Sequence, residues 1–198
     1  MNHYYIIYKP YQVLSQFSAV AEKKTLADFF KVPRDVYPVG RLDYDSEGLL
    51  LLTNDKLLNH RLLDPAFAHE REYLVQVDGA ITQEAISELA QTVTIQVDGK
   101  PYHTKPCKVS ILFDEPLLPE RIPPIRFRKK IPAPWIKLVL TEGKNRQVRK
   151  MTAQVGFPTL RLVRYRIGTI TLENMQPGEM ITMERDSIYK KLFHDNHS

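Results

Sequence analysis

The chain changes from polar to apolar within residues 37–53, which read Tyr37-Pro38-Val39-Gly40-Arg41-Leu42-Asp43-Tyr44-Asp45-Ser46-Glu47-Gly48-Leu49-Leu50-Leu51-Leu52-Thr53. The first part contains Pro38, Gly40 and Ser46 and therefore predicts a loop over 37–47. The apolar run that follows predicts a buried strand over 48–53. Catalytic side chains often lie on loops that a rigid strand holds in place. These residues therefore indicate both a buried sheet and a candidate site beside it.

The loop carries three carboxylates, those of Asp43, Asp45 and Glu47, and three interpretations compete for them. The spacing imitates the start of a calcium-binding EF-hand loop, but the twelfth position, which needs a bidentate Glu, is Asn54, so calcium is excluded. A role in turn formation is the better interpretation for Asp45 and Glu47. For Asp43 a role as a nucleophile stays open beside the structural one.

Outward from this segment, short strands alternate with short helices. Apolar patterning predicts strands over 4–8, 71–77, 92–97, 104–113, 135–141, 159–167, 169–172 and 179–183. Helices are predicted after the N-caps Thr25 and Thr82, from 54 to 64 with its four leucines on one face, and over 145–155. Residues 116–134 contain six prolines and predict a surface insertion. Adjacent strands outnumber helices, which favours an α+β fold with a mostly antiparallel sheet.

Composition narrows the class of protein. The chain has 198 residues and a net charge of +5. It shows no apolar run near the roughly 20 residues of a membrane span and no signal-peptide order at its start. Its single cysteine, Cys107, cannot form an internal disulfide, and no Cys/His cluster predicts a metal site. We therefore expect a cytoplasmic protein that binds no membrane, no metal and no cofactor.

Positive charge is concentrated in two stretches. Residues 143–172 contain seven Lys or Arg and no acidic residue, and a second basic cluster lies over 121–130. Uncompensated basic stretches suit a polyanion such as a nucleic acid, although a solvated basic surface is the plain alternative.

Four blocks of the sequence resemble the pseudouridine synthases of the RsuA type. Residues 37–53 are similar to the central motif of that family, and 70–75 to its strand with an active-site tyrosine. Residues 142–151 and 158–164 match two further family motifs, so the likeness spans about 3–184. The resemblance implies a mostly antiparallel mixed sheet in two lobes, flanked by helices around a central active-site cleft. It implies one catalytic domain over 1–198, whose lobes share a continuous sheet, with 116–134 as a basic insertion. The chain starts directly at the first catalytic strand, without the S4-type RNA-binding domain of many members, and so is similar to the compact RluE branch.

The resemblance also implies an activity and its residues. The RluE branch modifies large-subunit (23S) ribosomal RNA, so we expect an isomerase that converts one uridine of that RNA to pseudouridine. Asp43 would attack uracil C6 or ribose C1′, and the nearby guanidinium of Arg149 would offset the rise in its pKa that a water-poor pocket causes. Tyr73 would stack on the uracil, Leu162 would close the pocket, and Arg41 would contact the flanking phosphate or fill the space left by the flipped base. Without the resemblance, Tyr73 and Leu162 are ordinary core residues and Arg149 an ordinary helix residue.

Phosphate contacts are expected from the basic residues of the later motifs, namely Lys144, Arg146, Lys150, Arg161, Arg164 and Arg166. The expected partner is large-subunit ribosomal RNA, free or in an assembling ribosomal particle, bound by a monomer. The alternative is a catalytically silent ribosome-assembly factor of the same fold, and the presence of Asp43, Tyr73 and Arg149 disfavours it. A glycosidase would need a second carboxylate at a defined separation, for which Glu47 is the candidate, but the basic stretches fit RNA better.

Overall fold

The computed structural model describes residues 1–126 and 128–193, which form two compact units. Unit 1 contains Met1–His69 and the chain from Arg164 onward, and unit 2 contains Glu70–Val163. Strand β11, Thr159–Ile167, contributes its first five residues to unit 2 and its last four to unit 1. The expected α+β fold is confirmed, with antiparallel pairing between the main strands of each unit.

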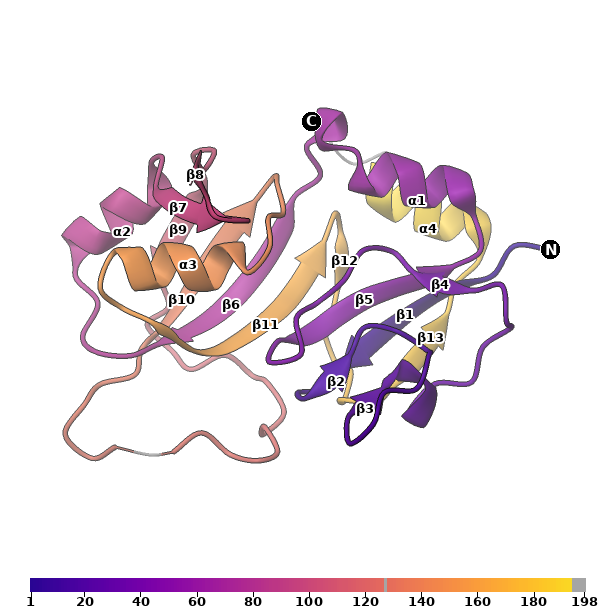
Figure 1. The fold of residues 1–198 in the computed structure, drawn as a ribbon, viewed down its shortest axis with the longest axis horizontal. Coiled ribbons are helices and arrows are strands. Elements are labelled where there is room, and N and C mark those ends of the chain that lie inside the picture. The colour runs from indigo at the N-terminus through magenta and orange to yellow at the C-terminus, as the bar shows by residue number, and fades with distance from the viewer. Residues whose placement is uncertain (127, 194–198) are drawn as a thin grey trace. The chain divides into compact units, whose positions relative to one another are not determined.

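The sheet of unit 1 is built around β5, Glu47–Thr53, in which every residue is buried. Its strand order is β13 (Met180–Thr182), β1 (Tyr4–Lys9), β5, and then the second half of β11. Short strands β4 (Tyr37–Pro38) and β12 (Ile170–Thr171) pair with β5 and β11. Helices α1 (Lys56–Leu63) and α4 (Arg185–Phe193) lie side by side next to this sheet (Figure 1).

The remaining part of unit 1 packs on β5 with apolar side chains. It includes the parallel pair β2 (Val13–Leu14) and β3 (Lys24–Thr25) and the short 3-10 helices Leu26–Asp28 and Pro65–Phe67. Leu50 and Leu52 share a buried cluster with Ile7, Val13, Leu26, Phe30, Val36 and Leu42. Because side chains alternate along a strand, Leu49 and Leu51 face the opposite side. Both faces of β5 are thus covered, which is why its sequence is a continuous apolar run.

Gly48 is needed where β11 approaches the start of β5. Its φ is +115°, and an added Cβ would lie 2.4 Å from the carbonyl oxygen of Arg164. The Arg164 guanidinium also donates from Nε to the Leu49 carbonyl oxygen at 2.8 Å. The glycine therefore permits the close backbone contact that fixes the strand after the Asp43 loop.

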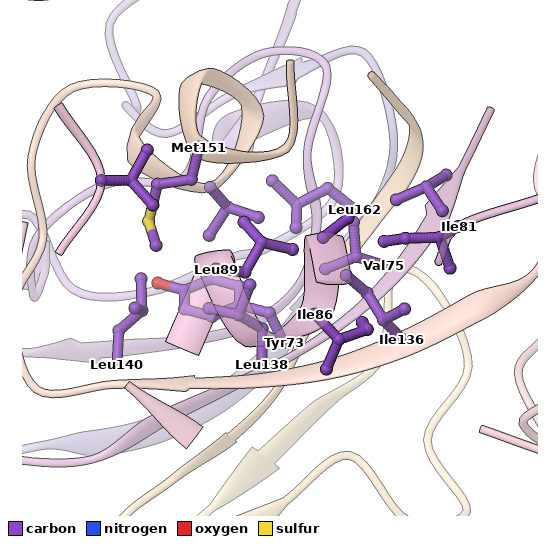
Figure 2. Packing of buried hydrophobic residues seen from close by; sticks show 14 of the residues in the cluster. Tyr73, Val75, Ile81, Ile86, Leu89, Ile136, Leu138, Leu140, Met151 and Leu162 are labelled. Carbon is purple, nitrogen blue, oxygen red and sulfur yellow. The ribbon is translucent and has the colours of Figure 1, made fainter. Parts of the chain in front are cut away.

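Unit 2 is a sheet with helices packed on one face. Its strand order is the first half of β11, then β6 (Arg71–Val77), β10 (Trp135–Leu140) and β9 (Lys108–Ile111). Alternate residues of β6 and β10 share one buried cluster with side chains of α2 (Gln83–Ala90) and α3 (Gln147–Gln154), as Figure 2 shows. The hairpin of β7 (Thr94–Val97) and β8 (Lys100–His103) adds Ile95 and Tyr102 to this core, and Val93, just before β7, belongs to it as well.

Most predicted elements are found, and several expectations need correction. The helix expected after Thr25 is only a 3-10 turn, although Thr25 does form a capping box with Asp28. The strand expected over 104–113 covers only Lys108–Ile111. Strands β2, β3, β4 and β8 and helix α4 were not predicted, and β4 lies inside the segment expected to be a loop over 37–47. In α1, Leu58 and Leu62 are buried but Leu57 and Leu63 are exposed, because leucines one residue apart are turned about 100° from each other on a helix.

The segment between β9 and β10 contains no helix or strand among its described residues, as its prolines predict. Residue 127, which belongs to the predicted insertion, lies outside the described residues. The insertion is tied to unit 2 by the Arg128–Asp78 ion pair and by Arg161, whose Nη2 donates to the Pro119 carbonyl oxygen at 2.8 Å. Within the part of the chain that the structure describes, no helix is long and apolar enough to cross a membrane.

Candidate active site

Asp43 lies in unit 1, in the loop that leads into β5, and is partly exposed. Its backbone carbonyl accepts a hydrogen bond from the Ser46 N–H at 3.0 Å, which closes a tight turn. Leu42 is buried in the core while Arg41 is exposed. The loop therefore anchors its apolar residue inside and leaves the neighbouring Arg41 and Asp43 accessible.

The loop is also held from the segment that follows β1. The N–H of Gln12 donates to the Tyr44 carbonyl oxygen at 2.9 Å. The Ser15 hydroxyl donates to the Leu42 carbonyl oxygen at 2.7 Å and accepts from the Leu42 N–H at 3.0 Å. The residues on both sides of Asp43 thus have their backbone fixed by this segment.

Lys9, at the end of β1, is a buried cation in the same unit and was not singled out from the sequence. Its side chain is fully buried, and its Nζ donates to the carbonyl oxygens of Val13 at 2.7 Å and Pro10 at 3.0 Å. Burial lowers the pKa of Lys9 to about 7, against the opposing effect of the carboxylates of Glu47, Asp43 and Asp45, while Arg164 adds to the lowering. A lysine inside the apolar stretch Ile6-Ile7-Tyr8-Lys9 was the signal that could have drawn attention to it.

Of the other two carboxylates in this segment, that of Glu47 is buried. Glu47 is 2 % exposed at the first position of β5, and its charge acts on Lys9. Among residues 1–126 and 128–193, no group of three or more His, Cys, Asp or Glu side chains is arranged to hold a metal ion. The charges of Glu47, Asp43 and Asp45 oppose the loss of the proton from the buried Lys9.

Tyr73 and Leu162 lie in unit 2 and belong to its hydrophobic core. Tyr73, on β6, is 8 % exposed, and Leu162, on β11, is 5 % exposed. Figure 2 shows both among the side chains of α2, α3, β6 and β10. Packing in the core of unit 2 fixes the positions of both side chains.

Arg149 lies on α3 in unit 2 and is partly buried. Its Nη1 donates to the Thr159 carbonyl oxygen at 3.3 Å. The side chains of Val148, Met151 and Thr152 on the same helix are buried, which orients the helix on its sheet. Arg149 therefore projects from a helix whose position is fixed by core packing.

The loop before α3 is organised by Glu142, which is 5 % exposed. Its carboxylate accepts hydrogen bonds from the Tyr102 hydroxyl, from the Lys105 N–H at 2.9 Å and from Gln147 Nε2 at 2.7 Å. The bond to Glu142 raises the pKa of Tyr102 to about 12, with burial as a smaller cause. The Gln147 side chain in turn accepts from the Lys144 N–H at 2.9 Å. One buried carboxylate thus joins hairpin β7–β8, the basic loop and α3.

The predicted RNA-contact residues have different surroundings. Lys144 and Arg146 are exposed and Lys150 is partly exposed, all at or near the start of α3. Arg161 and Arg164 are buried, and both donate to backbone carbonyl oxygens. Arg166 is partly exposed and its Nη1 donates to the Gly168 carbonyl oxygen at 2.6 Å. The accessible charge of the set is therefore concentrated on the loop before α3 and the first turns of that helix.

Comparison with known proteins gives a consistent result. Residues 3–154 match the family model described as RNA pseudouridylate synthase. The chain is 50 % identical over 174 residues to a protein of Vibrio parahaemolyticus named ribosomal large subunit pseudouridine synthase E, covering 88 % of this chain and 71 % of that protein. A protein of the same name from Xanthomonas axonopodis is also 50 % identical, over 87 % of this chain and 89 % of its own. A crystal structure titled pseudouridylate synthase superposes with a TM-score of 0.76 and 26 % identity, covering 97 % of this chain and 74 % of that one.

Proposed function

The chain belongs to the RNA pseudouridylate synthase family, and from that premise we propose that it converts one uridine of large-subunit ribosomal RNA to pseudouridine, with Asp43 as the nucleophile. The single observation that carries the choice of RNA is the 50 % identity to proteins named ribosomal large subunit pseudouridine synthase E. The choice of Asp43 is supported by its partly exposed carboxylate on a loop with a fixed backbone.

The proposed reaction is an isomerisation in which all atoms of the nucleotide are retained except one exchanged proton. The Asp43 carboxylate forms a covalent bond to uracil C6 or ribose C1′, and the glycosidic bond between N1 and C1′ breaks. The base turns, C5 bonds to C1′, the proton on C5 is lost, N1 gains a proton, and the bond to Asp43 is released. The steps require no oxidant, reductant or external group donor.

We propose Tyr73, Arg149 and Leu162 as the other members of the catalytic set, with Arg41 as a contact of the flanking nucleotide. Support for Tyr73 and Leu162 is that core packing fixes both side chains, as a ligand-contacting residue requires. Support for Arg149 is that it lies on a helix held by buried side chains of its own unit.

For the phosphate contacts we propose Lys144, Arg146 and Lys150 first, because they lie together at the start of α3, two of them exposed and the third partly exposed. Arg161, Arg164 and Arg166, which donate to carbonyl oxygens, would act mainly by holding strands and loops in place. Exposed Arg126, Lys129 and Lys130 of the insertion are further candidates for RNA contacts. The enzyme would act as a cytoplasmic monomer on free RNA or on an assembling ribosomal particle.

The test is to map pseudouridines in ribosomal RNA from cells that lack this protein. We expect one large-subunit site to be lost, restored by the wild-type gene and not by an Asp43→Ala variant. Loss of no site would refute the enzymatic proposal. Restoration by Asp43→Ala would instead favour the catalytically silent assembly factor, whose effect on modification would be indirect.

A further inference from the structure

Asp43 is flanked by two residues whose backbone groups are held by one segment, residues 12–15. On one side the Gln12 N–H donates to the Tyr44 carbonyl oxygen at 2.9 Å. On the other side the Ser15 hydroxyl bonds to both the carbonyl oxygen and the N–H of Leu42, at 2.7 and 3.0 Å. The Ser15 hydroxyl therefore bonds both polar backbone groups of Leu42, the residue next to Asp43.

Ser15 is itself held firmly. It is 6 % exposed and follows β2, whose Val13 is 1 % exposed in the core of unit 1. The next residue, Gln16, donates from its N–H to the Leu14 carbonyl oxygen at 2.8 Å and accepts from the Leu26 N–H at 2.9 Å. The Ser15 hydroxyl is therefore held in place by its surroundings, and its hydrogen bonds to Leu42 attach the Asp43 loop to it.

Leu42 depends on this hydroxyl. Its side chain is buried in the core, and its backbone belongs to no helix or strand of the described chain. Buried N–H and C=O groups outside regular structure need hydrogen-bond partners, and the Ser15 hydroxyl is the partner of both groups of Leu42. Without the Ser15 hydroxyl, the N–H and C=O of Leu42 would lose their hydrogen-bond partner. The peptide group between Leu42 and Asp43 would then shift.

We infer that Ser15 is a positioning residue of the proposed reaction, because its hydroxyl fixes the Leu42 backbone and thereby the place from which the Asp43 carboxylate attacks the nucleotide. This inference rests on the function proposed above. A nucleophile must lie close to its attack geometry, and a displacement of about 1 Å can cost on the order of a hundredfold in rate. Binding of RNA depends on other residues and should be little changed.

The experiment measures the single-turnover rate at saturating enzyme and, separately, the dissociation constant for an RNA substrate. Ser15→Ala should lower the rate about 10- to 100-fold and leave the dissociation constant within about twofold. Ser15→Thr, which keeps a hydroxyl but adds a methyl group, should be faster than Ser15→Ala. Ser46→Ala is the matched control: Ser46 lies in the same loop, is 1 % exposed, and its hydroxyl has no hydrogen-bond partner among the described residues. It should keep the wild-type rate.

Three results would overturn the inference. The first is a Ser15→Ala rate equal to that of Ser46→Ala. The second is a Thr variant no faster than the Ala variant, which would mean that size rather than hydrogen bonding matters. The third is a loss confined to RNA affinity. If Ser15→Ala does not fold, Ser15→Cys replaces it, since a thiol is a weaker donor, and a wild-type rate in that variant would equally refute the role. Asp43→Ala and wild type in the same assay separate this test from that of the proposed function, since an active Asp43→Ala or an inactive wild type would refute the function itself.

Discussion

At the scale of single residues, the pKa of Lys9 reflects both its burial and the charges of the Asp43 loop. A lysine with no exposed surface loses its hydration, and two carbonyl oxygens and the charges of three carboxylates offset only part of that loss. The result is a pKa of about 7 in place of the ordinary 10.5. The charge of this residue is thus sensitive to pH near neutrality.

The shift in the Lys9 pKa predicts how stability changes with pH. Between pH 7 and 10.5 the lysine binds a proton in the unfolded chain but largely not in the folded one. Its contribution to the free energy of unfolding therefore rises with pH in that window, by up to about 1.4 kcal/mol per pH unit, and is constant below it. Lys9→Met removes this contribution. Urea unfolding of both proteins at several pH values above 7 should show the wild type gaining stability relative to the variant as pH rises. A difference that does not change with pH would contradict the assigned pKa.

The residues of the site were only partly predictable from sequence. The acidic loop at 43–47 and the basic stretch at 143–172 stand out by spacing and charge, and the roles of Tyr73 and Leu162 came from family resemblance alone. The packing of these two in the core is what an isolated sequence would suggest for them. Ser15 could not be predicted because its importance lies in contacts with backbone groups, which side-chain patterns do not record. Lys9 was predictable in principle, as a charged residue at the end of an apolar stretch.

At the scale of elements, Asp55 joins three parts of unit 1. It is the N-cap of α1, where Oδ1 accepts from the N–H groups of Leu57 and Leu58. Its Oδ2 accepts from the hydroxyls of Tyr4 on β1 and Tyr189 on α4, both at 2.8 Å. Burial acts to raise the pKa of Asp55, but these hydrogen bonds outweigh it and the pKa is lowered. The stabilisation is therefore present above the ordinary pKa of 3.8 and is lost as pH falls through the lower folded value.

Asp55→Ala should destabilise the protein by about 2–4 kcal/mol, because it removes a helix cap and leaves two tyrosine hydroxyls without their acceptor. Urea unfolding at neutral pH measures the change. The matched control is Asp35→Ala, which removes an exposed aspartate that accepts from Asn54 Nδ2 at 2.7 Å and should have a much smaller effect on stability. Equal changes in the free energy of unfolding for the two substitutions would mean that the Asp55 carboxylate does not stabilise the packing of β1, α1 and α4.

The loop before α3 gives a prediction about RNA affinity. The Lys144 ammonium lies 4.8 Å from the centre of the Tyr102 ring, and Lys150 is one turn into the helix. If both contact phosphates, each change to Ala should weaken RNA binding and reduce the slope of log affinity against log salt by about one. Lys100→Ala, an exposed lysine on β8, is the control and should leave the slope unchanged. An unchanged slope in both lysine variants would exclude them as phosphate contacts.

The elements that sequence patterns missed have physical explanations. Hairpin β7–β8 turns at Asp98 and Gly99, both with positive φ, and an Asp-Gly pair between two strands is a strong hairpin signal in the sequence. Strand β8 itself is short, mostly exposed and contains Pro101, so its composition does not resemble a strand. Helix α4 has a charged sequence in which Ile188, Tyr189 and Leu192 are buried. These residues form its buried face through contacts with the rest of unit 1, such as the hydrogen bond from Tyr189 to Asp55, which the sequence of the helix alone does not predict.

At the scale of the whole molecule, two distant parts of the sequence meet in unit 1. The first 69 residues pair with the chain from Arg164 onward, through β1 with β13 and through Gly48 against Arg164. Hydrophobic periodicity identifies strands but not their partners, so this long-range pairing could not be predicted from the sequence pattern. The confirmed family membership in turn gives the reaction, while the choice of Asp43 as nucleophile remains the central proposal.

The most direct test of that proposal uses ribosomal RNA that carries tritium at C5 of its uridines. Formation of the bond between C5 and C1′ displaces that hydrogen, so one tritium is released for each pseudouridine made. Wild-type protein should release tritium from one site of large-subunit RNA. The near-isosteric Asp43→Asn variant should bind the RNA with similar affinity and release tritium at least about a thousandfold more slowly. Release by Asp43→Asn at a rate close to that of the wild type would contradict the assignment of Asp43 as the nucleophile.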